Sequence, residues 1–166
     1  MSLVKLTYSE FDDEPQHWSI SDTTFTNINL IVGKNSSGKS RLLSIINSFA
    51  ELLTGQRKIP SIPSRFSVDL VLDKKDFSYE LVFGSKGVSS ELLTIDGIEK
   101  LVRNEDGSGQ IFYQKEDKFL DFKLPQDALA TVNRRDEIQH PFLIELNKWA
   151  NSAVIYLGRI LVNQKF

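Results

Sequence analysis

The chain has 166 residues, of which 40% are hydrophobic and 25% charged, and its formal net charge is −2. This length is enough for one domain with a hydrophobic core, and the charge gives no overall attraction to nucleic acid. The absence of cysteine excludes disulfides, thiolate metal sites and cysteine nucleophiles, and two histidines are too few for a histidine-rich metal cage. No apolar run approaches the roughly 20 residues that span a bilayer and no signal peptide opens the chain, so we expect a cytoplasmic protein.

The first 55 residues predict strands followed by a helix. Residues 3–11 alternate between apolar and polar side chains, and a second short strand is expected at 17–20, so the two would form a hairpin. The run Ile-Asn-Leu-Ile-Val at 28–32 is compact and β-branched, which is typical of a buried strand. Apolar residues then recur at helical spacing from Leu42 to Leu53, and Gly55 stands where a helix C-cap glycine belongs.

The character of the sequence changes from 66 to 124. Short alternating segments are separated by turn sequences such as Asp-Gly and Ser-Lys-Gly, which predicts an antiparallel meander of about six half-buried strands. Beyond Pro125, residues 126–139 are polar with a partly helical pattern. Apolar residues from Phe142 to Ala150 are spaced like one face of a helix, and 154–157 has the composition of a last strand.

Residues 33–40, Gly-Lys-Asn-Ser-Ser-Gly-Lys-Ser, fit the pattern G-x-x-x-x-G-K-[ST] at every fixed position. The glycines let the backbone curl so that successive N–H groups face inward, and the following helix directs its positive end at the same point. Lys39 would give a full positive charge to the terminal phosphates, and the Ser40 hydroxyl would be a ligand of Mg²⁺. A strand before the loop and a helix after it are the context that this chemistry requires.

The predicted cofactors are therefore ATP and Mg²⁺, with Ser40 as the metal ligand. The predicted cofactor-binding residues are Gly33, Lys34, Asn35, Ser36, Ser37, Gly38, Lys39, Ser40 and Arg41. Lys34 is a variable position of the pattern, and its side chain is expected in solvent. Arg41 lies in the first helical turn, where a cation is unfavourable against the helix dipole. It either reaches a phosphate or a partner, or it is a surface arginine.

The stretch from 25 to 50 resembles the ABC-type ATPases of the RecF, SMC and overcoming-lysogenization-defect (OLD) group, whose loop reads G-x-N-[GS]-[SA]-G-K-[ST] before a leucine-rich helix. The matching residues are Asn35, Ser36, Ser37, Gly38, Lys39, Ser40, Leu42, Leu43 and Ile46. The resemblance implies an α/β fold class, the N-terminal lobe of a P-loop NTPase with an antiparallel β-meander subdomain. It also implies a head-to-head homodimer around ATP, and several members of the group act on DNA or in phage defence.

With this resemblance, we expect a single P-loop ATPase N-terminal domain over 1–166. It would consist of a nucleotide-binding strand–loop–helix core at 1–55, an antiparallel β-subdomain at 65–124, and a helix and strand at 125–166 that return to the core.

Two motifs that such ATPases need for hydrolysis are absent from the chain. No hydrophobic strand ends in Asp-Glu, the pair that would hold Mg²⁺ and position the attacking water, and no Leu-Ser-Gly-Gly-Gln signature follows. The stretch 68–73 alternates with a period of two, so it predicts a half-buried strand rather than the catalytic one. The catalytic residues are unknown. We expect the N-terminal portion of a longer ATPase, which binds ATP but does not turn it over efficiently alone.

Two other functions are compatible with the same loop. A non-catalytic dimerisation or interaction module would hold nucleotide only as part of its structure, and a small-molecule kinase would pass phosphate to a metabolite. A GTPase fits less well because the sequence has no N-K-x-D motif for guanine: Asn147-Lys148 is followed by Trp149-Ala150.

Several further residues have both a functional and a structural interpretation, and the structural one is preferred for each. Aromatic candidates for stacking on adenine are Trp18 and Phe25. Glutamine candidates for a contact with Mg²⁺ are Gln126 and Gln164. A basic patch for DNA would combine Arg134, Arg135, Lys148 and Arg159, and an aromatic platform for single-stranded nucleic acid would combine Phe112, Tyr113, Phe119 and Phe122. DNA is thus a possible partner that these residues do not establish.

Overall fold

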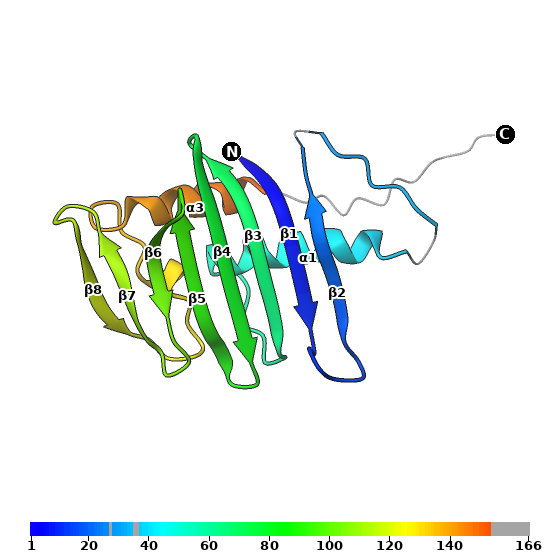
Figure 1. The fold of residues 1–166 in the computed structure, drawn as a ribbon, viewed down its shortest axis with the longest axis horizontal. Coiled ribbons are helices and arrows are strands. Elements are labelled where there is room, and N and C mark those ends of the chain that lie inside the picture. Colours follow the sequence, from blue (N-terminus) through cyan, green and yellow to red (C-terminus); the bar gives the residue numbers. More distant parts are fainter. Residues whose placement is uncertain (27, 35–36, 154–166) are drawn as a thin grey trace.

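A computed structural model describes residues 1–26, 28–34 and 37–153. Eight antiparallel strands form one sheet in the order β2-β1-β3-β4-β5-β6-β7-β8, with the helices on one face of it (Figure 1). The strands are β1 (Ser2–Glu10), β2 (Trp18–Thr24), β3 (Ser64–Leu72), β4 (Lys75–Gly84), β5 (Gly87–Ile95), β6 (Ile98–Arg103), β7 (Ser108–Tyr113) and β8 (Lys118–Lys123). The helices are α1 (Lys39–Thr54), α2 (Ala130–Asn133) and α3 (Pro141–Ser152).

The predicted N-terminal hairpin and the predicted six-strand meander are both confirmed, and they belong to the same sheet. Strand β1 pairs with β2 on one side and with β3 on the other, so the hairpin is continuous with the meander β3–β8. The alternation on β3 shows how the faces are assigned: Phe66, Val68, Leu70 and Leu72 are buried, and the residues between them are not. Residues 68–73 therefore form the half-buried strand end and turn that the period of two predicts.

Helix α1 is confirmed with the expected end. Gly55 adopts φ 79°, the left-handed conformation that favours glycine, and its N–H donates to the carbonyl oxygen of Leu52. Phe49 anchors the helix, because its ring centroid lies 5.5 Å from that of Phe66 on β3 and 6.0 Å from that of Trp149 on α3. Helix α3 is also confirmed, with Pro141 in its first turn. Across the described residues, no helix has the length and apolar composition needed to cross a membrane.

The predicted buried strand at 28–32 is wrong in this structure. The segment carries no strand assignment, and Ile28, Leu30 and Val32 are 91%, 85% and 75% exposed. The physical reason is that a β-branched run becomes a buried strand only when neighbouring strands bond to it on its edges and other elements cover its faces. None of the strands in the described part of the chain pairs with this run. The predicted strand at 154–157 lies outside the described residues.

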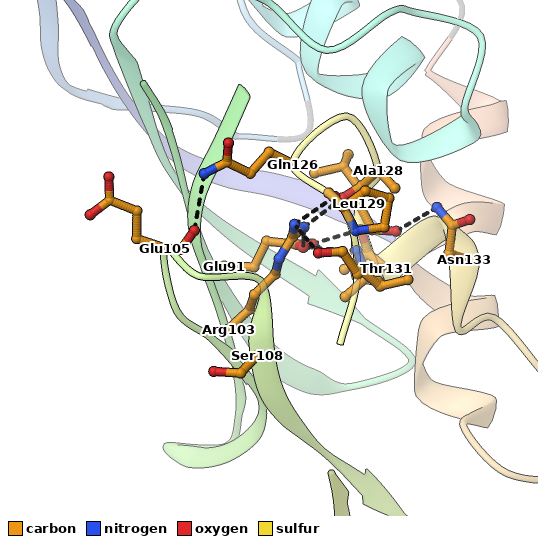
Figure 2. Close-up of polar contacts among 12 residues, drawn as sticks. Glu91, Arg103, Glu105, Ser108, Gln126, Ala128, Leu129, Thr131 and Asn133 are labelled. Atoms are coloured by element: carbon orange, nitrogen blue, oxygen red, sulfur yellow. Dashed lines mark hydrogen bonds and ion pairs between the residues drawn. The ribbon is translucent and has the colours of Figure 1, made fainter. Parts of the chain in front are cut away.

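A buried ion pair between Glu91 on β5 and Arg103 on β6 fastens the segment after β8 to the sheet (Figure 2). The two side chains are fully buried, and the carboxylate and guanidinium lie 3.0 Å apart. Arg103 also donates to the carbonyl oxygen of Pro125 at 2.8 Å, while Glu91 accepts from the N–H of Ala130 and from the Tyr79 hydroxyl, each at 2.8 Å. Such a pair is tolerated in a core because further hydrogen bonds compensate both charges, although Arg103 Nε is buried without an acceptor among the described residues.

We expect truncation of two leucines to change the free energy of unfolding by very different amounts. Leu70 is 1% exposed within the sheet core, and Leu30 is 85% exposed. Leu70→Ala should lower the free energy of unfolding by about 2–5 kcal/mol through the cavity it leaves. Leu30→Ala should change it by less than about 0.5 kcal/mol. Urea denaturation of both variants measures the difference, and equal losses would contradict the exposed position of 28–32.

We expect the free energy of unfolding to depend on pH through the buried Tyr79 hydroxyl. Burial, followed by the nearby Glu91 carboxylate, raises the pKa of Tyr79 well above its ordinary value of 10.0. Below about pH 10, the pKa of the unfolded chain, the contribution of the Tyr79 hydroxyl to the free energy of unfolding is fully present. As the pH rises from about 10 towards the folded-state pKa, the unfolded chain ionises first and the contribution is lost.

The measurement compares the free energy of unfolding of wild type and Tyr79→Phe from pH 8 to pH 11. Other groups are common to both proteins and cancel. The advantage of wild type over Tyr79→Phe should stay constant up to about pH 9 and shrink above pH 10. A gap that stays constant over the whole range would show that Tyr79 titrates alike in both states.

Candidate functional site

A cavity of about 740 Å³ opens beside the first turn of α1. Its wall comes from three parts of the chain: strand β2, the segment 31–33 and the start of the helix. The described residues that line it are Trp18, Ser19, Ile20, Ile31, Val32, Gly33, Ser37, Gly38, Lys39, Arg41 and Leu42. The volume lies within the range of about 300–1,000 Å³ that is usual for small-molecule sites. The glycine- and lysine-rich loop singled out in the sequence therefore borders a space large enough for a ligand.

Gly38 turns the chain from the loop into α1. It is the N-cap residue with φ 87°, and its carbonyl oxygen accepts the N–H of Leu42 at 2.9 Å. Among the described residues no side chain caps the helix, and no acidic residue lies in its first turn. The first N–H groups of a helix have no partner within the helix, and they carry the positive end of its dipole. This end of α1 is therefore suited to an anion.

The Lys39 ammonium lies inside the loop and joins its two ends. It donates to the carbonyl oxygens of Gly33 at 2.7 Å and Lys34 at 2.6 Å, and to the Ser37 hydroxyl at 3.2 Å. The carbonyl partners are uncharged, so the positive charge of Lys39 has no counter-ion among the ion pairs of the described residues. A full charge and a helix N-terminus thus face the same cavity.

The remaining predicted loop residues stay predictions. Asn35 and Ser36 lie outside the described residues, and Ser40 is exposed in the first turn of α1. The described lining of the cavity holds cations, hydroxyls and apolar side chains but no carboxylate. These groups can hold an anion, and the Ser40 hydroxyl has the hard oxygen that Mg²⁺ prefers. A general base or an acidic metal ligand would have to come from elsewhere.

Arg41 occupies a place that the sequence did not predict. Its Cζ lies 3.5 Å from the centroid of the Trp18 ring, and its guanidinium forms an ion pair with Glu10. The other carboxylate oxygen of Glu10 accepts the Tyr8 hydroxyl at 2.8 Å. Glu10 and Trp18 are direct register partners on β1 and β2, which is the signal that could have joined them if the hairpin register had been predicted.

Most of the other candidate residues contact other parts of the protein and do not line the described cavity. Phe25 is partly buried against the core and is not among the described cavity residues. The Gln126 amide donates to the carbonyl oxygen of Glu105 at 3.0 Å. Gln164 lies outside the described residues.

The fold separates the residues of the aromatic platform that was considered for single-stranded nucleic acid. Phe112 and Phe119 pack edge to face at 5.6 Å, whereas Phe122 is buried and Tyr113 packs beside His140. The residues of the proposed basic patch also differ from one another: Arg134 lies over the Phe122 ring, Lys148 pairs with Glu145, and Arg159 lies outside the described residues. The described residues do not establish DNA as a partner.

The comparison with known protein families gives a match over most of the chain. The family model described as "AAA domain, putative AbiEii toxin, Type IV TA system" matches residues 28–152, which is 125 of the 166 residues. The match begins just before the loop at 33–40 and ends with α3. No curated protein and no solved structure gives a significant match.

Proposed function

The chain belongs to this family of AAA domains, a P-loop NTPase family, and on that premise we propose that it binds ATP with Mg²⁺ through residues 33–41. The AAA-type domain implies a nucleotide-binding, ATPase-like function. The finer assignment to the ABC-type ATPases of the RecF and OLD-like group is part of our proposal, and it rests on the asparagine-serine-serine loop and the leucine-rich helix behind it.

The position of Lys39 carries the proposal. Its ammonium is held by neutral carbonyl oxygens at the centre of the loop, next to an uncapped helix N-terminus and a cavity of about 740 Å³. A triphosphate entering this space would replace the carbonyl partners with charged oxygens, and charge-assisted hydrogen bonds are the stronger ones. The Ser40 hydroxyl would hold Mg²⁺, which neutralises charge on the phosphates.

Efficient hydrolysis requires more than the described lining of the cavity provides. A carboxylate must position water and complete the metal shell, and the described lining has none. We therefore propose that the chain binds ATP without efficient turnover by itself. A head-to-head homodimer around the nucleotide would supply further groups, as the resemblance to the RecF and OLD-like group implies.

The alternatives are an interaction module that holds nucleotide structurally and a small-molecule kinase. Partner binding that survives loss of nucleotide binding would favour the module. Transfer of phosphate from ATP to a metabolite would favour the kinase, but no acceptor group stands out in the cavity. The toxin in the family's description forms no part of the proposal, because the described cavity offers anion binding and no further chemistry.

Replacement of Lys39 tests the proposal directly. Lys39→Ala removes the one lysine ammonium that lines the described part of the cavity. Affinity for ATP with Mg²⁺ should fall about 10- to 100-fold, the value of a charge-assisted hydrogen bond. Isothermal titration calorimetry measures the change. Lys58→Ala removes the same charge from an exposed lysine outside the cavity and should leave the affinity unchanged. Equal affinity in both variants would refute the proposal.

Alanine substitutions at two glycines with similar positive φ distinguish an effect on the shape of the loop from a general loss of stability. Gly38 has φ 87° and Gly97 has φ 76°, and a Cβ at either position would meet no atom within 4 Å. Alanine at each position should cost about 1–2 kcal/mol because of the left-handed conformation. Gly38→Ala should also weaken ATP binding about tenfold as the loop shifts to relieve the strain. Gly97→Ala, in the turn between β5 and β6, should lower stability alone.

Thermal denaturation measures the stability of the two variants, and calorimetry measures their affinity for ATP. A loss of ATP affinity in Gly97→Ala equal to that in Gly38→Ala would mean that general destabilisation, and not the shape of the loop, controls binding.

A further inference from the structure

Arg41 has a fixed place at the wall of the cavity. It belongs to the first turn of α1, two residues after Lys39, and its guanidinium lies against the Trp18 ring of β2 with 3.5 Å between Cζ and the ring centroid. Both residues line the cavity that the loop borders. Stacking of a guanidinium on an indole is favourable because the cation lies on the negative face of the ring.

The charge of Arg41 is already compensated. Glu10 gives one carboxylate oxygen to Arg41 and the other to the Tyr8 hydroxyl, which donates at 2.8 Å. The Glu10 side chain is only 15% exposed. If Arg41 moved to a phosphate, this largely buried carboxylate would keep a single hydrogen-bond donor, and an unpaired buried charge is strongly unfavourable. Arg41 is therefore held where it is.

The stack leaves one planar surface open. Trp18 has Arg41 on its face, and Tyr8 packs against it with a centroid separation of 6.2 Å and an interplanar angle of 57°. A nucleobase could reach the indole face that carries Arg41 only by displacing the guanidinium. The Arg41 side chain, in contrast, is 44% exposed. The outer side of the guanidinium is thus a flat group at the cavity wall that remains open to a ligand.

We propose that Arg41 is the base-stacking residue of the site: the base of the bound nucleotide lies on the outer face of its guanidinium, in a three-layer stack of base, Arg41 and Trp18. Nucleic-acid bases are known to stack on arginine planes as well as on aromatic rings. Trp18 and Glu10 act as positioning residues, since they hold the plane and its charge. This inference rests on the proposed function, because Lys39 and the loop must hold the phosphates of the same molecule.

The experiment compares two probes, ATP and inorganic tripolyphosphate, each with Mg²⁺, by calorimetry. Arg41→Ala should weaken ATP binding about tenfold, the scale of one stacking contact, and leave tripolyphosphate binding unchanged. Arg41→Lys keeps the charge but not the plane and should show the same loss. Retained tripolyphosphate binding demonstrates in the same measurement that the loop of each variant is folded.

A positioning role for Trp18 has its own test. Trp18→Leu should lower the affinity for ATP and not for tripolyphosphate, and Trp18→Phe should recover most of the loss because an aromatic ring again supports the guanidinium. A purely structural effect of Trp18 would lower the affinity for both probes alike.

Three results would overturn the proposal. Parallel losses of both probes in Arg41→Ala, restored by Arg41→Lys, would make Arg41 a phosphate ligand. Tighter ATP binding in Arg41→Ala would mean that Arg41 covers a base site on Trp18. If the wild-type chain binds neither probe, or if Lys39→Ala binds both as well as wild type does, the proposed function itself fails and the stack fails with it.

Discussion

The packing of α1 against the sheet is the constraint on which the candidate site depends. Phe49 fixes the helix between β3, β4 and α3, with centroid distances of 5.5 Å to Phe66, 6.0 Å to Tyr79 and 6.0 Å to Trp149. An α-helix rises 1.5 Å per residue, so the start of the helix lies about 15 Å from this anchor. Because the helix is stiff, the anchor determines where the first turn meets β1 and β2, and hence where the loop and Arg41 are held.

In the described chain, two Glu–Arg ion pairs join different helices or strands. They differ in burial, and therefore in whether the arginine is accessible to a ligand. Glu91 and Arg103 are fully buried, and their hydrogen bonds go to the backbone after β8, so the pair fixes a segment and offers nothing to solvent. Glu10 and Arg41 lie at the wall of a cavity, and the arginine side chain is 44% exposed. The second pair keeps a surface for a ligand while its charge is satisfied.

The sequence predicts those elements whose signal is local. The period of two in 66–124 and the helical spacing of Leu42–Leu53 depend on residues a few positions apart, and the corresponding strands and helix are present. The run 28–32 has an equally clear local pattern. Its burial, however, depends on partner strands and covering elements that are distant in the sequence, so the local pattern does not reveal them. Pattern therefore identifies a propensity for strand, and the surrounding chain decides whether that propensity is used.

The candidate site also has one part that a local sequence pattern predicts and one part that depends on residues distant in the sequence. The pattern G-x-x-x-x-G-K-[ST] predicts Lys39 beside the N-terminus of a helix, and α1 begins at that residue. The strand that the pattern usually follows is not formed by residues 28–32. The contact of Arg41 with Glu10 spans 31 positions of the chain, and that with Trp18 depends on the hairpin register, so no local pattern could reveal either one.

In our proposal, a single helix turn sets the geometry of both ends of the bound nucleotide. Lys39 and Arg41 are two residues apart on one rigid backbone, and side chains at such positions point about 200° apart around a helix axis. The first can therefore turn into the loop while the second turns towards β1 and β2, without either side chain crossing the other. Phosphate binding uses charge and amide direction, which are indifferent to the base. The residues that hold Arg41 in place, Glu10 and Trp18, belong to strands formed by the first 24 residues. In our proposal the loop provides affinity for a triphosphate, and the β1–β2 hairpin, through Glu10 and Trp18, positions the guanidinium on which the attached base stacks.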